Sequence, residues 1–551
     1  MKLYPLIKTV FFVSIIFFSG CQQKQDTKPN IIIFFSDELA PEYVGAYGGK
    51  MPTPNLDRLA ANGIKFENTY VVAPMCTPSR FAILTGKYPG RCIHPDFLGT
   101  YPEDQPYVIA WNTYLEGTLP TLPGILSENG YFTGMTGKWH IGKIGEDIDL
   151  PDFTEDADLD DLNINIKLQL HQEIVKNEVK KTAGFDFAES VLWGNYDNFV
   201  VNQLRYHNFP WITYGAIELL EAAKKVGKPF FLYVATTAVH GPGHAETFNQ
   251  DLRYTLEGKV DGVMEYALLA DSMKAVLENL PPPVRHKYAG MACLDNHIKH
   301  VMNKLEELEM DKNTIVLFMA DHNVEPGKAT CYKKGLHVPF ILHWPVKFDQ
   351  GSTTDQLVSS VDILPTILEM ADVPLPEGSK FDGISFLPSL NNQSITSRPH
   401  VYAESGLARS VADGRWKYIT FRYPEGVIRQ MQSGEINYAP NYLNLEKQAH
   451  SSIAMEHFPG YFDADQLYDL ENDPYEQENL AYQSEYSEKL RKMQDILSAY
   501  LVTFDHAYSI SDTSFMRSEK FQELVDQSLS YGTDYIPWLK RDHGSIIWPP
   551  R

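Results

Sequence analysis

The sequence predicts an α/β fold, a large mixed sheet flanked by helices, and three observations support it. Three continuous runs of β-branched and aromatic residues indicate strands buried on both faces: residues 30–36, 230–236 and 314–320. Helical patterns alternate with these runs at residues 56–62, 119–130, 211–225 and 284–310. The 551 residues are too many for one small core, so we expect a large domain, residues 30–395, and a smaller C-terminal one, residues 396–551.

The first 21 residues have the layout of an export signal. Lys2 and Lys8 precede an apolar stretch, residues 10–18, that is too short to span a membrane, and Ser19-Gly20-Cys21 follows. The small residues before Cys21 resemble a bacterial lipobox, which predicts cleavage there and a lipid on Cys21; an ordinary cleaved signal is the alternative. Residues 22–29 are polar and predict a tether. We therefore expect an exported protein in the periplasm, or one that its lipid anchors to the outer membrane.

The charge and the cysteines exclude other classes. The formal net charge is −23, whereas nucleic-acid binding favours a basic surface. Any positive potential for an anionic ligand must therefore be local to its site. Apart from Cys21 and Cys76, only three cysteines remain, which cannot form a disulfide framework: Cys92, Cys293 and Cys331.

Two carboxylates end the first predicted strand. Asp37 and Glu38 follow residues 30–36 directly. In open α/β sheets the ligand lies beyond the carboxyl ends of the strands, so these acids are candidate metal ligands. The alternative is a solvated pair of acids, which is common at strand ends.

Residues 76–80, Cys-Thr-Pro-Ser-Arg, place a cysteine, a hydroxyl and a fixed cation together. Pro78 suits the first turn of a helix, and Arg80 returns to the side of Cys76 if a helix begins here. The free amides of that helix start would face an anion. The alternative is a buried cysteine in an ordinary turn.

The pentapeptide resembles the sulfatase signature Cys-x-Pro-Ser-Arg, and Gly137-Lys138-Trp139-His140 resembles a second signature of that family. Further similar segments follow in the family's order: residues 238–244, 320–323, 327–339 and 361–366. The resemblance spans residues 28–480. It implies a sulfatase of the formylglycine type with an alkaline-phosphatase-like α/β fold.

The resemblance also implies roles for the matching side chains. A maturase would oxidise Cys76 to formylglycine, whose hydrate is the nucleophile. Lys138, Lys328 and Arg80 would stabilise charge on the sulfate oxygens. His140 would hydrogen-bond the hydrate and assist its collapse.

The resemblance implies an acid and a metal as well. His240 would protonate the departing alcohol, a task that suits histidine because its pKa lies near neutral pH, and His244 is the next candidate. Asp37 and Asp321 would bind one calcium ion together with the formylglycine at position 76, and Glu38 and His322 align with ligand positions but stay open as direct ligands. The sequence departs from the family's pattern at Glu38, Ala320, Asn323 and His337.

Three segments are less informative. We interpret residues 91–117 as a loop near the site. Residues 143–196 are rich in acids, but a calcium loop beginning at Asp156 would need an acid where Lys167 stands, so we interpret the segment as a solvated loop. After residue 395, short aromatic strands at 415–419 and 466–474 and a helix at 484–501 resemble the C-terminal sulfatase subdomain.

The predicted function is hydrolysis of the sulfate esters of a sulfated polysaccharide or its oligosaccharides, with release of inorganic sulfate. One alternative is a formylglycine-type hydrolase of phosphate monoesters or diesters, because both anions are tetrahedral. The other is a lipid-anchored glycan-binding protein that has lost catalysis. The sugar and the position of its sulfate stay open.

Overall fold

The computed structural model describes residues 28–142, 153–196, 199–268, 270–348, 351–391, 398–443, 449–511 and 513–531. The predicted export signal at residues 1–21 and most of the predicted tether at residues 22–29 lie outside these residues. No helix in the described part is long and apolar enough to cross a membrane.

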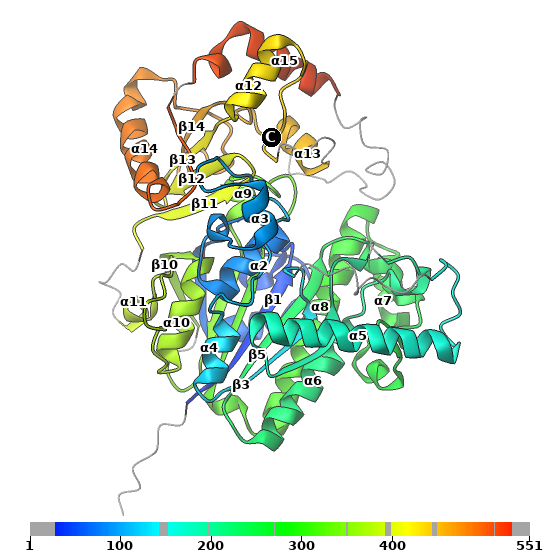
Figure 1. The fold of residues 1–551 in the computed structure, drawn as a ribbon. Helices are drawn as coiled ribbons and strands as arrows, with labels where there is room; N and C mark the ends of the chain where they lie inside the picture. Colours follow the sequence, from blue (N-terminus) through cyan, green and yellow to red (C-terminus); the bar gives the residue numbers. More distant parts are fainter. Residues whose placement is uncertain are drawn as a thin grey trace, which may run out of the picture.

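An eight-stranded mixed sheet forms the centre of the molecule (Figure 1). Its strand order is β10-β2-β9-β8-β1-β5-β3-β4. The bounds are β1 Asn30–Asp37, β2 Ile64–Tyr70, β3 Phe132–Lys138, β4 Phe187–Leu192, β5 Phe230–Val239, β8 Thr314–Ala320, β9 Phe340–His343 and β10 Ser352–Ser359. Only β9 runs antiparallel to its neighbours. The predicted fold class is confirmed.

The three strands predicted from apolar runs lie side by side at the centre of the sheet. Strand β1 pairs in parallel with β5 and β8, with Ile31 opposite Phe231 and Ile315. Because the three strands share a direction, their carboxyl ends meet at one edge of the sheet. Asp37 and Asp321 therefore become neighbours although 284 residues separate them.

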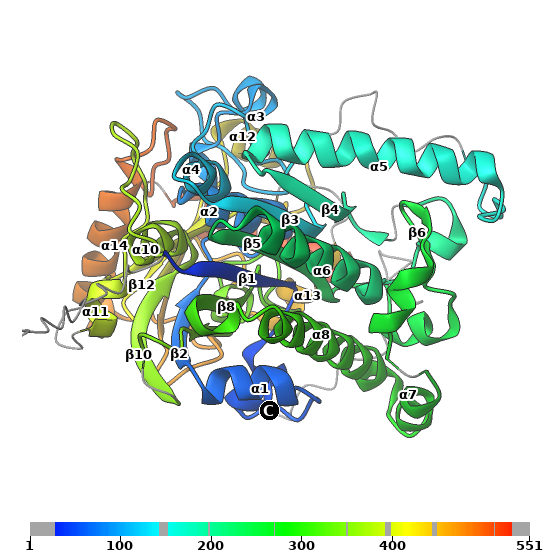
Figure 2. The same cartoon turned by 90° about the horizontal axis from the view of Figure 1, so that it is seen from below.

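Helices cover both faces of this sheet, as the alternating side chains of β1 require. Phe34 packs edge-on against His297 of α8, whereas Phe35 lies under Arg80 of α2 on the opposite face. Helices α2 (Cys76–Thr85), α4 (Leu122–Glu128) and α10 (Ile363–Met370) lie on the second face, and α1 (Pro54–Ala61), α6 (Phe209–Val226) and α8 (Pro282–Glu307) on the first (Figure 2).

The interpretation of residues 143–196 as a solvated loop holds for residues 153–161, which are mostly exposed turns, but it is wrong for the residues that follow. Residues 162–183 form the 22-residue helix α5, and β4 follows as an edge strand. Leu168, Val175 and Val179 are buried along one face of α5, which packs against β4. The acids at residues 155–161 precede α5, so they do not reveal the apolar stripe of the helix. Residues 143–152 lie outside the described residues, and residues 91–117, predicted as a loop, contain the short helix α3 (Pro95–Thr100).

A second, antiparallel sheet follows in the C-terminal part (Figure 1). It orders β11 (Val401–Ser405), β12 (Ala408–Ala412), β13 (Trp416–Phe421) and β14 (Asp465–Asp469), and α14 (Ser487–Leu501) packs on β12 and β13. The remaining helices are α7 Ala270–Leu277, α9 Lys333–Leu336, α11 Leu387–Asn391, α12 Glu425–Ser433, α13 Ala449–His457 and α15 Glu519–Tyr531. Glu404 of β11 joins this sheet to the large part through its backbone amide, which donates to the carbonyl of Val72.

Candidate active site

Four buried side chains converge at the carboxyl edge of the central sheet. Asp37 ends β1, Asp321 and His322 follow β8, and Cys76 begins α2. One potential ligand atom from each lies within 4.8 Å of the others. The sequence predicted all four as site residues, and the structure brings them together.

Cys76 is the first residue of α2, as the position of Pro78 in the first turn predicted. Its Sγ lies 3.2 Å from His322 Nε2, 3.4 Å from Asp37 Oδ1 and 3.7 Å from Lys138 Nζ. Burial and then the charge of Asp37 raise the pKa of the Cys76 thiol well above its usual value. An unmodified Cys76 is therefore a poor nucleophile, since the thiolate is the reactive form.

The guanidinium of Arg80 hydrogen-bonds other groups of the protein. Its guanidinium is fully buried and donates through Nε and NH2 to Asp321 Oδ2, at 3.1 and 2.9 Å, and through NH1 to the carbonyl of Lys138 at 2.9 Å. This fork fixes the Asp321 carboxylate and the end of β3 relative to α2. Asp321 also accepts from the backbone amide of Glu38.

Lys138 and Asp37 form a buried ion pair next to Cys76. Burial alone would raise the pKa of Asp37, but Lys138, His240 and Arg80 hold that pKa well below its usual value. Lys138 Nζ also donates to Asn195 Oδ1 at 2.5 Å. Asn195, after β4, is a site residue that the sequence analysis missed.

Lys328 and Glu38 form a second ion pair, with Nζ 2.5 Å from Oε2. Lys328, together with His240, lowers the pKa of Glu38 to about 2 although burial opposes this. Glu38 does not belong to the group of four converging side chains; its carboxylate is held by Lys328 instead. It adopts a left-handed backbone conformation, φ 56°, immediately after β1.

Two of the predicted histidines lie beside these ion pairs. His240 Nδ1 is 2.7 Å from the carbonyl of Gly241, to which it donates, and Nε2 lies 3.7 Å from Glu38 Oε2. Burial, and then the charge of Lys328, lower the pKa of His240 to about 3. Burial and Lys138 likewise lower the pKa of His140, whose Nδ1 is buried without a hydrogen-bond partner among the described residues. His244, the alternative acid, is buried and stacks on His207.

The converging group suits a divalent cation. Asp37 and Asp321 offer carboxylate oxygens, His322 offers Nε2 while its Nδ1 lies 2.8 Å from the carbonyl of Asn323, and the sulfur of Cys76 marks the position of the oxygens that formylglycine would carry. Two carboxylates and further oxygens match a hard cation. The second nitrogen of His322 is fixed by a backbone carbonyl, as is usual for a metal-binding histidine.

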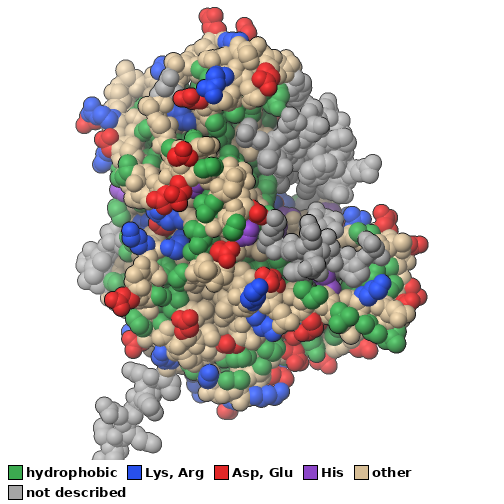
Figure 3. Space-filling view, in the orientation of Figure 1, with side chains coloured by type: hydrophobic (Ala, Val, Ile, Leu, Met, Phe, Trp, Pro, Cys, Tyr) green, Lys and Arg blue, Asp and Glu red, His purple; other side chains and the backbone are tan. Residues whose placement is uncertain are grey.

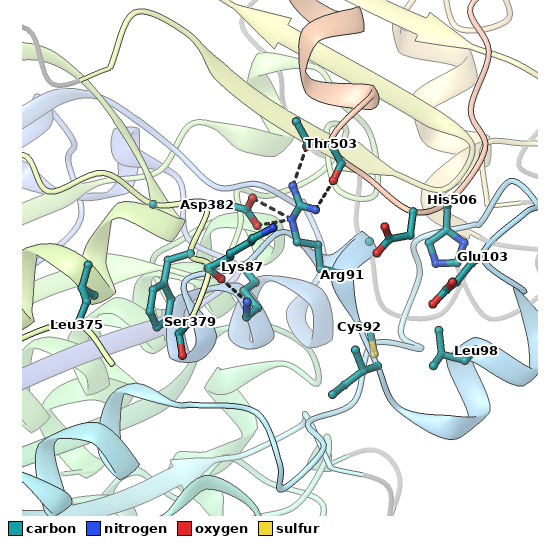
Figure 4. A pocket seen from close by; sticks show the side chains of 16 residues that line it. Lys87, Arg91, Cys92, Leu98, Glu103, Leu375, Ser379, Asp382, Thr503 and His506 are labelled. Carbon is teal, nitrogen blue, oxygen red and sulfur yellow. Dashed lines mark hydrogen bonds and ion pairs between the residues drawn. The ribbon is translucent and has the colours of Figure 1, made fainter. Parts of the chain in front are cut away.

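A separate cavity of about 840 Å³ lies at the other end of α2 and contains none of the predicted site residues. Figure 4 shows Arg91 there between Asp382 and Thr503, with hydrogen bonds to both. Lys87 donates to a backbone carbonyl in the same cavity. Over the face shown in Figure 3, acidic and basic side chains are interspersed.

Comparisons with known proteins define the family. The family model described as "Sulfatase" matches residues 29–373, and one described as "N-sulphoglucosamine sulphohydrolase, C-terminal" matches residues 327–424. The chain therefore belongs to the sulfatase family. It is a sulfuric ester hydrolase with the alkaline-phosphatase-like fold, and this family generally uses formylglycine and a divalent metal.

Individual relatives are distant but cover most of the chain. An N-acetylgalactosamine-6-O-sulfatase of Bacteroides thetaiotaomicron is 26% identical, over 90% of this chain and 98% of its own. Human arylsulfatase A is 28% identical, over 82% and 83%. The structure is similar to one solved in complex with its substrate D-glucosamine-2-N,6-O-disulfate, with a TM-score of 0.56, 20% identity, and coverage of 90% of this chain and 100% of that one.

Proposed function

We propose that this sulfatase hydrolyses sulfate esters of a sulfated polysaccharide or its oligosaccharides through a formylglycine made from Cys76 by a maturase. The observation that carries the proposal is the surroundings of Cys76. A thiol whose pKa is raised by burial is unsuited to attack, yet it lies within 4 Å of a lysine, a carboxylate and a histidine. Conversion to an aldehyde hydrate gives this position two hydroxyl groups, one to attack sulfur and one to be deprotonated afterwards.

The glycan class is supported by relatives of known specificity. A Formosa agariphila protein named "Ulvan-active sulfatase" is 26% identical over 86% of this chain, in addition to the Bacteroides N-acetylgalactosamine-6-O-sulfatase. Residues 91–117, residues 143–208 and the C-terminal tail would select the sugar. Export with a lipid on Cys21 fits a polymeric substrate outside the cell.

Lys138 and Lys328 would bind the sulfate oxygens. In the structure Lys138 is paired with Asp37 and Lys328 with Glu38. A bound sulfate would therefore share each ammonium group with a carboxylate or replace that carboxylate as its partner. This arrangement is preorganised, because the ammonium groups are held before the substrate arrives. Arg80 would act through Asp321 and the end of β3, which it fixes by hydrogen bonds.

Asp37, Asp321 and His322 would hold a calcium ion, with position 76 beside it. When bound, the cation would polarise a sulfate oxygen and favour ionisation of the hydroxyl at position 76. Glu38 would contribute to the sulfate pocket through Lys328 rather than as a direct ligand.

His240 would donate the proton to the departing alcohol. The hydrogen bond from Nδ1 to Gly241 leaves Nε2 facing the site, next to Glu38. The negative charge of a bound sulfate ester favours the imidazolium and opposes the effect of Lys328, so substrate binding would raise the low pKa of His240. His140 would contact the hydrate at position 76 and assist its collapse.

The test is sulfate release by protein coexpressed with a maturase, measured on a panel of defined sulfated oligosaccharides, with the matched phosphate ester of one phenol beside its sulfate ester. We expect release from at least one oligosaccharide, and loss of turnover in Cys76→Ala without loss of folding. Faster hydrolysis of the phosphate ester would favour the phosphoester alternative. Binding of glycans with no turnover of any ester would favour the glycan-binding alternative.

A further inference from the structure

The loop that carries His240 is attached to a second buried histidine, His207, to which the sequence analysis gave no role. His207 lies just before α6 and is 1% exposed. Its Nδ1 is 2.8 Å from Thr237 Oγ1 and its Nε2 is 2.8 Å from the carbonyl oxygen of Pro242. The two partners flank His240, three residues before it and two after it.

The chemistry of these partners fixes the proton on His207. A carbonyl oxygen only accepts, so Nε2 carries the hydrogen and donates it to Pro242. Burial lowers the pKa of His207 to about 4, so the ring is neutral at neutral pH and Nδ1 accepts the hydroxyl proton of Thr237. One neutral imidazole thus satisfies both ends of the loop, and no other tautomer does so.

Aromatic rings hold His207 itself in place. His244 stacks on it with ring centroids 3.7 Å apart and an interplanar angle of 19°, and Tyr196 meets it edge-on at 5.1 Å. The hydroxyl of Tyr196 accepts from the backbone amide of Asn208, the next residue in the chain. The ring is therefore restrained in position and in orientation.

We infer that His207 is a positioning residue for the general acid, holding the loop at residues 237–242 so that Nε2 of His240 faces the leaving alcohol. The inference rests on the proposed function of His240. The two stacked histidines then have different roles: His207 hydrogen-bonds the loop, and His244 packs against the ring of His207. A general acid displaced by the loss of such a contact transfers its proton less effectively, because proton transfer requires hydrogen-bond reach.

The decisive variant is His207→Phe, which keeps a flat ring of similar size and removes both hydrogen bonds. We expect kcat for a sugar sulfate to fall by about 10²-fold, within the 10² to 10⁴ that general acid catalysis contributes. On an activated aryl sulfate, whose phenolate departs unaided, the loss should be less than about 5-fold by the same reasoning. KM should change little in both, and His207→Gln, which can still donate to Pro242, should recover part of the loss.

Two comparisons separate positioning from a general structural effect. His297→Phe removes another buried histidine that hydrogen-bonds a threonine, Thr213, at 2.7 Å, but on the α6–α8 contact away from the loop. It should lower the thermal unfolding midpoint without distinguishing the two substrates. The double variant His207→Phe/His240→Ala should be no slower on the sugar sulfate than His240→Ala alone, since both remove the same function.

Equal losses on sugar and aryl sulfates in His207→Phe, with selective losses in His240→Ala, would overturn this inference alone. Equal losses in His240→Ala would overturn the acid role and this inference with it. If His207→Phe does not fold, Thr237→Val removes the hydroxyl that bonds His207 Nδ1 and leaves the bond to Pro242. It should show the same substrate selectivity with a smaller loss of kcat, and equal losses on both substrates would likewise overturn the inference.

Discussion

Truncating Asp321 should damage the stability of the protein as well as its activity, and the structure indicates by how much. Asp321→Ala removes two charge-assisted hydrogen bonds from Arg80, at 2.9 and 3.1 Å, and one from the backbone amide of Glu38 at 3.0 Å. Arg80 is fully buried, so it would be left as a charge without its main partner. Such losses cost about 3–5 kcal/mol. Asp37 lies 4.0 Å from the same guanidinium and compensates in part, so we expect the lower end of this range.

The assay is urea unfolding of chelator-treated protein. Without metal, the change in the free energy of unfolding reports the lost ion pair and not lost metal binding. Asp321→Asn keeps an oxygen acceptor and should lose less than Asp321→Ala. Asp251→Ala is the matched control, because Asp251 accepts from Nε and NH2 of Arg253 at 2.9 and 2.5 Å and from a backbone amide at 3.1 Å, while the Asp251 and Arg253 side chains are 34% and 40% exposed. That variant should lose much less stability, because solvent screens an exposed pair and its net contribution is small. Equal free energies of unfolding for wild type and Asp321→Ala would refute the reasoning.

Three further predictions follow from the same site and its neighbourhood. Peptide mass spectrometry of active protein should find formylglycine at Cys76, and activity with an unmodified thiol alone would contradict the proposed nucleophile. Calcium should raise the thermal unfolding midpoint of chelated wild type and restore its activity, but should do neither in Asp37→Asn; unchanged rates in metal-free protein would exclude the assignment. The pKa of Glu189 is raised to about 7 by burial and by Glu257, so the folded state holds a proton that the unfolded state releases at lower pH. The stability that this proton provides is fully present below about pH 4.5 and is lost as the pH rises through about 7. Glu189→Gln should weaken this fall in the unfolding midpoint between pH 5 and 8, and an unchanged pH profile would contradict the shift.

Strand ends were the most predictable part of the site. Asp37 ends and Asp321 follows a short apolar run, Lys138 ends β3, and parallel neighbours bring such ends to one edge of a sheet. The placement of Cys76 and Arg80 was equally predictable, because a proline favours the first turn of a helix and so indicates where α2 begins. Ordered motifs then supplied roles that residue types alone do not supply.

Contacts between segments distant in sequence were not predictable. Asn195 reaches Lys138 from a segment interpreted as a solvated loop, and nothing around it marks a site. His207 has no periodic or motif signal, because its partners are a hydroxyl and a carbonyl 30 and 35 residues away. The pairing of Arg80 with Asp321 also depends on which strands are neighbours. A motif gives the residue types of a site, whereas the order of the strands in the sheet decides which of these residues form hydrogen bonds or ion pairs.

The charges of the site suggest why cation and anion should bind together. Arg80, Lys138 and Lys328 are matched by three carboxylates in contact with them, those of Asp321, Asp37 and Glu38. A sulfate ester alone adds a negative charge next to two of these acids, and a divalent cation alone adds two positive charges next to the lysines. Each ligand would therefore offset the charge that the other introduces. A cation bound by Asp37 would also weaken the ion pair between Asp37 and Lys138, which frees Lys138 to bind the sulfate. Because such coupling is reciprocal, inorganic sulfate should bind more tightly when calcium is present, and calcium more tightly when sulfate is present.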